Sequence, residues 1–149
     1  MSGETIEVWG TQKSLETNGS AIPNGSLLAA SAGTYDKMST DGNGFPDAQF
    51  VLSCQFGTAP AEGSVISLVA QPLALDGASA NAQTPEPSRL TRFIGNFIVN
   101  DVTSMQHMEL MATDLPPKAL YYLYNANTGQ SISAGWVLRI KPRTYKAAP

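Results

Sequence analysis

The stretch DAQFVLSCQFG, residues 47–57, is the part of the chain that indicates its fold class most directly. Apolar side chains recur at every second position: Ala48, Phe50, Leu52, Cys54 and Phe56. The positions between them are polar, with Val51 as the one exception. Successive side chains of a β-strand point to opposite faces, so this alternation gathers the apolar set on one face. The stretch therefore predicts a strand with one buried side and one side toward solvent.

Comparable runs predict further strands along the chain. The run VISLVAQ, residues 65–71, is apolar at nearly every position and lies between Gly63 and Pro72, which favours a central strand covered on both faces. Strong strand patterns also occur in TIEVWG, RFIGNFIVND, MQHMELMATD and WVLRIKP, and weaker ones at residues 14–16, 26–31 and 120–124. About eight or nine short strands separated by Gly, Pro and Asn predict a β-sandwich or a barrel.

Helices are not expected beyond a single short turn. The 13 glycines and 10 prolines are spread along the chain, and no window of a dozen residues free of them carries an apolar stripe at helical spacing. The length of 149 residues fits one domain with a single core. The residues expected in that core are Phe50, Leu52, Ile66, Leu68, Phe97, Trp136 and Leu138.

The stretch ALYYLYNANTGQSISAGWVLRIKPRTY, residues 119–145, contains two apolar runs separated by small and polar residues. Its turn-forming Asn and Gly residues predict a hairpin that pairs the two runs. One apolar face is expected from Trp136, Leu138 and Ile140, and the other from Leu120, Tyr122 and Tyr124. The alternative is that the connecting residues bind a ligand.

Four other connections are marked by composition. Residues 33–47 and 76–89 form two long loops, and loops of this length tend to carry function. The repeated triplets Asn18-Gly19-Ser20 and Asn24-Gly25-Ser26 match the N-glycosylation pattern, but Asn-Gly is also the preferred pair of tight hairpin turns. Two successive turns are therefore expected.

The composition excludes several classes of partner. Charged residues make up only 14% of the chain, against about 25% in an average soluble domain, so uncharged polar residues must cover most of the surface. A net charge of −3 with no basic stripe argues against nucleic-acid binding. No apolar run approaches the length of about 18 residues that indicates a membrane span. The start MSGETIEVWG lacks the features of a secretory signal, so synthesis and folding in a cytoplasm are expected.

The residue chemistry of enzymes and metal sites is also missing. His107 is the only histidine and lies in a predicted strand, and a nucleophilic triad would need Ser104 or another serine to meet it in space. Cys54 has no cysteine or histidine companion for a zinc site or a disulfide. The segment STDGNGFPD resembles a calcium loop, but position twelve of that register falls on Phe50, which favours a turn. The prediction is a protein without catalytic residues, metal or cofactor.

Three segments together resemble a group of small virion proteins of tailed bacteriophages: IEVWGTQKSLETNGSAIPNGSLLAAS, PDAQFVLSCQF and YYLYNANTGQSISAGWVLRIKPRTY. The resemblance covers most of the chain, and the two long loops are its least comparable parts. It implies a capsid decoration or cement protein, an antiparallel β-sandwich of jelly-roll type on the outer capsid surface. It also implies the major capsid protein as partner and a homo-oligomer with three-fold symmetry. The resemblance brings no active site with it.

The contact with a partner is expected from segments that the core does not need, above all from an N-terminal arm at residues 1–8. This arm starts with small polar residues and becomes strand-like at residues 5–9, so it can order by adding an edge strand to a neighbour. The candidate partner-binding residues are Glu4, Thr5, Ile6, Val8, Trp9, Tyr35, Pro85 and Pro87.

The alternative function is carbohydrate binding by a sandwich module on a phage head or tail. Surface glycans are commonly held on exposed aromatic side chains, for which the candidates are Trp9, Tyr35, Tyr121 and Tyr145. The favoured alternative is that each is half-buried at a sheet face or at a subunit contact.

Overall fold

A computed structural model describes residues 3–73 and 84–149, and within them the chain forms ten β-strands and no helix. The strands are β1 (Thr5–Trp9), β2 (Lys13–Gly19), β3 (Leu27–Ala29), β4 (Tyr35–Asp36), β5 (Asp47–Cys54), β6 (Val65–Pro72), β7 (Arg92–Ile98), β8 (Gln106–Ala112), β9 (Lys118–Asn125) and β10 (Trp136–Ala147). Every predicted strand is present. The additional one is β4, which lies inside the predicted loop 33–47.

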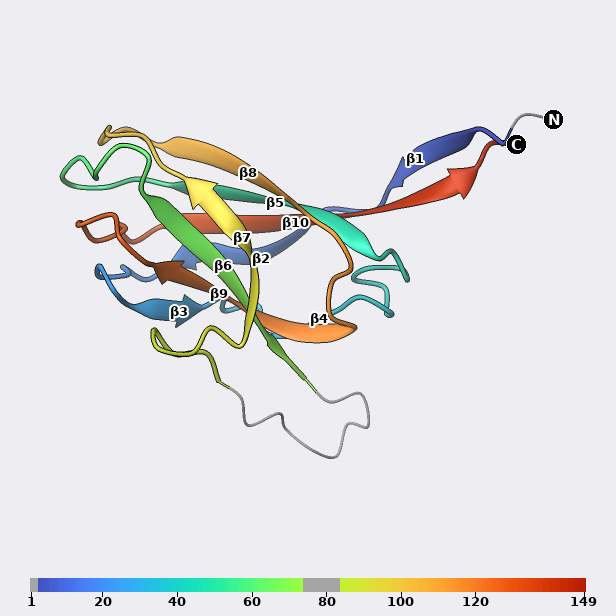
Figure 1. The fold of residues 1–149 in the computed structure, drawn as a ribbon, viewed down its shortest axis with the longest axis horizontal. Coiled ribbons are helices and arrows are strands. Elements are labelled where there is room, and N and C mark those ends of the chain that lie inside the picture. The colour runs from blue at the N-terminus through green and yellow to red at the C-terminus, as the bar shows by residue number, and fades with distance from the viewer. Residues whose placement is uncertain (1–2, 74–83) are drawn as a thin grey trace.

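The strands form two antiparallel sheets (Figure 1). The first sheet has the order β2-β10-β5-β8, with β1 also paired to β10. The second has the order β3-β9-β6-β7, with β4 also paired to β9. From β2 to β10 the chain passes repeatedly from one sheet to the other. The strand orders that result, β2-β10-β5-β8 and β3-β9-β6-β7, are those of a jelly roll, which is one arrangement of an all-β sandwich.

The core lies between the two sheets and contains all seven residues predicted for it, each buried. In β5 the alternation seen in the sequence is reproduced, because Ala48, Phe50, Leu52 and Cys54 face the second sheet. The ring of Phe50 lies 5.1 Å from that of Tyr121 in β9, centroid to centroid, which joins the two layers. The central strand β6 is buried along nearly its whole length between β7 and β9, as its continuous apolar run predicts.

The predicted pairing of the two C-terminal runs is wrong. β9 lies between β3 and β6 in the second sheet, whereas β10 lies in the first, so residues 126–135 cross between sheets and do not form a hairpin. The side chain of Asn125 is fully buried and donates to the carbonyls of Ile22 and Gln130, at 2.9 and 2.7 Å. Thr128 Oγ1 donates to Asn125 Oδ1 at 2.6 Å. The buried polar groups of this connection therefore form hydrogen bonds with one another and with the carbonyl of Ile22.

The predicted face of β9 is also wrong. The buried side chains are Ala119, Tyr121, Leu123 and Asn125, while the half-buried ones are Leu120, Tyr122 and Tyr124. Large apolar residues occupy both faces of this strand, so residue size did not indicate which face meets the core. In β10 the prediction is confirmed, because Trp136, Leu138 and Ile140 are buried.

Only one of the two Asn-Gly pairs forms a turn. Gly25 has a φ of 81° in the turn before β3, as predicted. Gly19 instead ends β2, where its lack of a side chain makes room for the indole of Trp136. The indole nitrogen of Trp136 donates to the carbonyl of Ser20 at 2.7 Å.

Candidate functional site

Strand β1 and the last five residues of β10, Arg143–Ala147, form a two-stranded antiparallel ribbon that we call the terminal ribbon. Their register pairs Thr5 with Ala147 and Trp9 with Arg143. Figure 1 shows this ribbon, in blue and red, extending away from the body of the sandwich. The strand-like part of the predicted N-terminal arm is thus paired with the end of its own chain, where the prediction had it pair with a neighbour.

The ribbon is isolated because β10 changes partners along its length. β5 accompanies β10 only as far as the pair Asp47–Arg143, and β2 only over the first half of the strand. Pro142 lies near this change, and its carbonyl accepts a hydrogen bond from the amide of Gly10 at 2.7 Å. Beyond Arg143 the described residues give β10 no strand partner except β1.

One face of the ribbon carries two aromatic rings, and each ring lies close to a basic side chain. Trp9, Arg143 and Tyr145 share this face, since residues opposite one another in the register point the same way. The guanidinium carbon of Arg143 lies 5.9 Å from the Trp9 ring centroid and 5.0 Å from that of Tyr145, within the range of a cation–π contact. Lys141 Nζ lies 5.9 Å from the Trp9 ring.

Two carboxylates hold the central cation of this face. Arg143 Nη1 lies 3.2 Å from Glu7 Oε1, and Arg143 Nη2 lies 3.4 Å from Asp47 Oδ2. Asp47 begins β5 and Glu7 belongs to β1, so Arg143 ties the ribbon to the body at its base. The rings remain accessible, because Trp9 is 38% exposed and Tyr145 is 54% exposed.

The base of the ribbon borders a hollow of about 520 Å³. The ribbon contributes Val8, Trp9 and Lys146, Pro142 lies just before it, and the segment before β5 contributes mainly polar groups. The hollow's lining residues in that segment are Thr40, Asp41, Asn43 and Phe45. The open surface here is therefore partly apolar and partly able to form hydrogen bonds.

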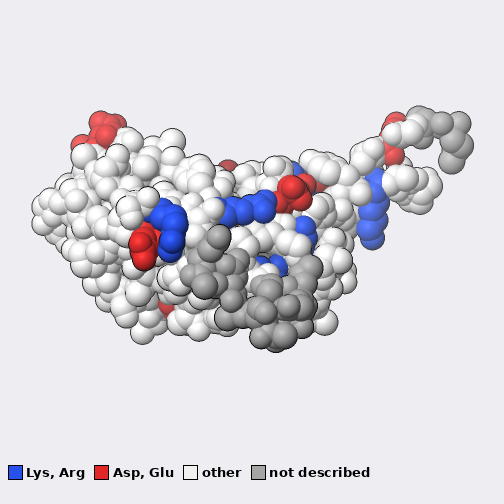
Figure 2. Space-filling view, turned by 60° about the horizontal axis from the view of Figure 1, so that its bottom comes forward, with Lys and Arg blue, Asp and Glu red and all other residues white. Residues whose placement is uncertain are grey.

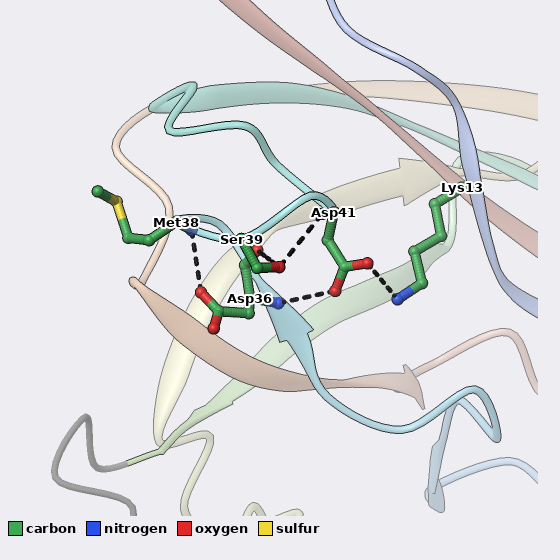
Figure 3. A network of polar contacts seen from close by, with 5 residues as sticks. All are labelled: Lys13, Asp36, Met38, Ser39 and Asp41. Atoms are coloured by element: carbon green, nitrogen blue, oxygen red, sulfur yellow. Dashed lines mark hydrogen bonds and ion pairs between the residues drawn. The ribbon is translucent and has the colours of Figure 1, made fainter.

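A network of polar contacts fixes the segment that forms this wall (Figure 3). Lys13 Nζ lies 2.9 Å from Asp41 Oδ1, and the backbone amide of Asp36 donates to Asp41 Oδ2 at 3.2 Å. Burial raises the pKa of Asp41, but the bonds from Lys13 and Asp36 outweigh it and lower this pKa overall. Asp41 is therefore a structural carboxylate, and the described residues contain no group of three or more potential metal ligands.

The structure brings some of the predicted partner-binding residues together and separates others. Glu4, Thr5, Ile6 and Trp9 are exposed on or beside β1, and Val8 is half-buried there. Tyr35 is 1% exposed in β4, so its predicted role at the surface is wrong. Pro85 is buried and Pro87 is exposed in the segment before β7. Part of the predicted loop that contains them, residues 76–83, lies outside the described residues.

The aromatic residues predicted as platforms for a glycan are also partly exposed and partly buried. Trp9 and Tyr145 are exposed, but Tyr121 is 1% exposed and packs in the core, so its assignment as a platform is wrong. Arg143 and Lys146 belong to this surface but were not among the predicted site residues. The alternation of Lys141, Arg143 and Tyr145 was a signal for it, but Pro142 was taken as the end of the strand.

His107 does meet a serine in space. Its Nδ1 lies 2.8 Å from Ser53 Oγ, across the direct pair that these residues form between β5 and β8. His107 is exposed on the outer face of the first sheet, and the nearby carboxylate of Glu109 accepts a bond from Gln49 at 2.7 Å. Within the described residues no carboxylate forms a hydrogen bond or ion pair with His107, so the described part of the chain does not supply the orienting acid of a triad.

Charged residues make up only 14% of the chain. Figure 2 shows mostly uncharged residues on the face turned toward the viewer, with acidic and basic side chains in small separate groups and both signs on the ribbon. Within the described residues there is no helix long and apolar enough to cross a membrane.

No protein-family model, no curated protein and no solved structure matches the chain.

Proposed function

We propose that the protein is a structural component of a tailed-phage virion that decorates or cements the outer capsid, to which it adds after synthesis in the host cytoplasm. The major capsid protein is its partner, and the terminal ribbon is its contact. The observation that carries this proposal is the ribbon itself, a projecting element that the sandwich core does not need and that exposes Ile6, Trp9 and Tyr145. The resemblance of the chain to such virion proteins supports the same function.

Energetic considerations favour the ribbon as a contact. Its backbone is already ordered by pairing with β10, so binding need not supply the entropy of about 1–2 kcal/mol per residue that a free arm would lose. Exposed aromatic side chains are the residues most enriched in interface hot spots. On a particle with many identical sites, several weak contacts act together, so modest affinity per contact suffices.

The test is co-sedimentation of purified protein with capsids that lack it, assembled from the major capsid protein of the phage that encodes the chain. The intact chain should bind these particles, while the variant without residues 1–8 and the double variant Trp9→Ala/Tyr145→Ala should remain folded and lose binding. The matched control is Phe93→Ala, which removes an equally exposed ring from β7. A second control is Ser131→Ala, an exposed position of the crossing 126–135.

The outcomes separate the contact from the function. Full binding by both ribbon variants would remove the ribbon from the contact. Failure of the intact chain to bind any capsid would remove the cement function itself.

A second candidate function is binding of a surface glycan at the same end of the molecule. Two observations favour it: the accessible rings of Trp9 and Tyr145, and the hollow with hydroxyl and amide groups at the base of the ribbon. Sugars bind to such combinations of an apolar platform and polar groups. Saturable binding on a glycan array that Trp9→Ala abolishes would support this function over cementing, and an array without saturable signals would end it.

A further inference from the structure

The terminal ribbon has two open edges. β1 pairs with β10 on one side only, and the stretch Thr144–Ala147 of β10 pairs with β1 on one side only, within the described residues. Figure 1 shows no other strand beside the ribbon. Open edges present unpaired amide and carbonyl groups, which can pair with a strand of another chain.

The two edges carry opposite charges. Glu4 and Glu7 are the charged residues of the β1 side, and Arg143 and Lys146 are those of the β10 side. Pairing β1 with β1 of a second copy would place acids near acids, and pairing β10 with β10 would place bases near bases. Pairing β1 of one copy with β10 of the next brings opposite charges together, which stabilises neighbouring strands. The favoured partner of each edge is therefore the other edge of an identical chain.

The ribbon also exposes apolar side chains on both of its faces. Ile6 is 44% exposed on one face and Tyr145 is 54% exposed on the other. An isolated two-stranded ribbon is marginally stable in water, and three or more strands are needed for independent stability.

We infer that the protein associates with further copies of itself through these edges, with β1 of each copy antiparallel to Thr144–Ala147 of the next. The contact joins two different surfaces, so it closes into a ring where the rotation between copies allows it. The inference names a contact for the homo-oligomer that the resemblance to virion proteins implies. It does not depend on capsid binding, because the contact uses the edges of the ribbon and forms between free chains in solution.

The first experiment measures the mass of the full chain by sedimentation at a series of concentrations. We expect a multiple of 15.8 kDa that dissociates on dilution. Glu4→Lys and Lys146→Glu should each weaken association by roughly fivefold per contact, because each places like charges together. The double variant Glu4→Lys/Lys146→Glu should restore it, and Glu62→Lys, an exposed position of the loop between β5 and β6, should leave it unchanged.

The second experiment identifies the edges that meet. Two single variants, Glu4→Cys and Lys146→Cys, are mixed and oxidised, and Cys54 does not interfere because it is buried. Disulfides between the two different variants are expected to dominate over those within either variant. The inference is overturned by a mass of one chain at every concentration, by association that both charge variants leave unchanged, or by disulfides that form mainly between identical variants.

Discussion

Replacing Gly19 by alanine should destabilise the protein through a single buried contact. A Cβ at this position would lie 2.0 Å from Cε2 and 2.3 Å from Nε1 of Trp136, much closer than carbon and nitrogen atoms can approach. Trp136 is 1% exposed, so its indole cannot move into solvent without leaving the core. The indole must shift against its neighbours, which also strains its bond to the carbonyl of Ser20.

The expected cost combines two effects. Overpacking a core costs about 1–3 kcal/mol, and an indole donor left buried without its acceptor costs about 1–3 kcal/mol more. With a total of about 4 kcal/mol, the melting temperature of a domain of this size should fall by about 8–16 °C.

The assay is thermal unfolding followed by calorimetry, with the near-ultraviolet circular dichroism of the tryptophans as a readout of packing. Gly57→Ala is the matched control, because a Cβ there would meet no atom within 4 Å. It should melt within about 1–2 °C of the unmodified chain, since surface changes usually alter stability by less than about 0.5 kcal/mol. If Gly19→Ala melted together with this control, the packing of β2 against Trp136 would be refuted.

Three further predictions follow from the core. Leu52→Ala should lower the free energy of unfolding by about 2–5 kcal/mol in urea titrations, whereas Val51→Ala on the opposite face should cost much less; equal effects would contradict the orientation of β5. Tyr121→Phe should raise stability by about 1 kcal/mol or leave it unchanged, because its buried hydroxyl has no hydrogen-bond partner among the described residues, and a clear loss would reveal a missing partner. Burial raises the pKa of Cys54 from 9.0 to about 12, so the unfolded chain loses this proton first. The contribution of this thiol to stability should therefore be fully present below pH 9 and be lost as the pH rises toward 12; a Cys54→Ala variant with an identical alkaline decline would exclude the thiol as a cause.

The strands and the core could be predicted because the burial of a strand determines the pattern of apolar and polar residues along it. In β5 every second side chain is apolar, and in β6 nearly all are, so each strand's position in the sandwich follows from its own residues. The same pattern of apolar and polar residues does not indicate which strands pair. β9 and β10 are adjacent in sequence and both strand-like, yet their pairing is decided by the fit of each sheet as a whole.

Only part of the candidate site could be predicted, because the local pattern of residues indicates strands but not their partners. The strand character of β1 is local, so Ile6 and Trp9 could be named from the sequence. That β1 pairs with the end of β10 is a contact between opposite ends of the chain, and no local pattern records it. Tyr35 and Tyr121 show the converse error, because an aromatic residue has the same sequence signature whether it packs in the core or projects from it.

The central place of β10 in the first sheet has a consequence for the order in which the molecule forms. β1, β2 and β5 all pair with this one strand, although it is the last of the ten to be synthesised. Until it has left the ribosome, β5 can pair only with β8, and β2 has no strand partner among the described residues. Strand pairings between distant parts of a chain form slowly, and unpaired edges in the meantime promote aggregation. The first sheet should therefore assemble in one late step, only once β10 has been synthesised, so a chain cut short before residue 136 is expected to aggregate instead of leaving a smaller folded domain.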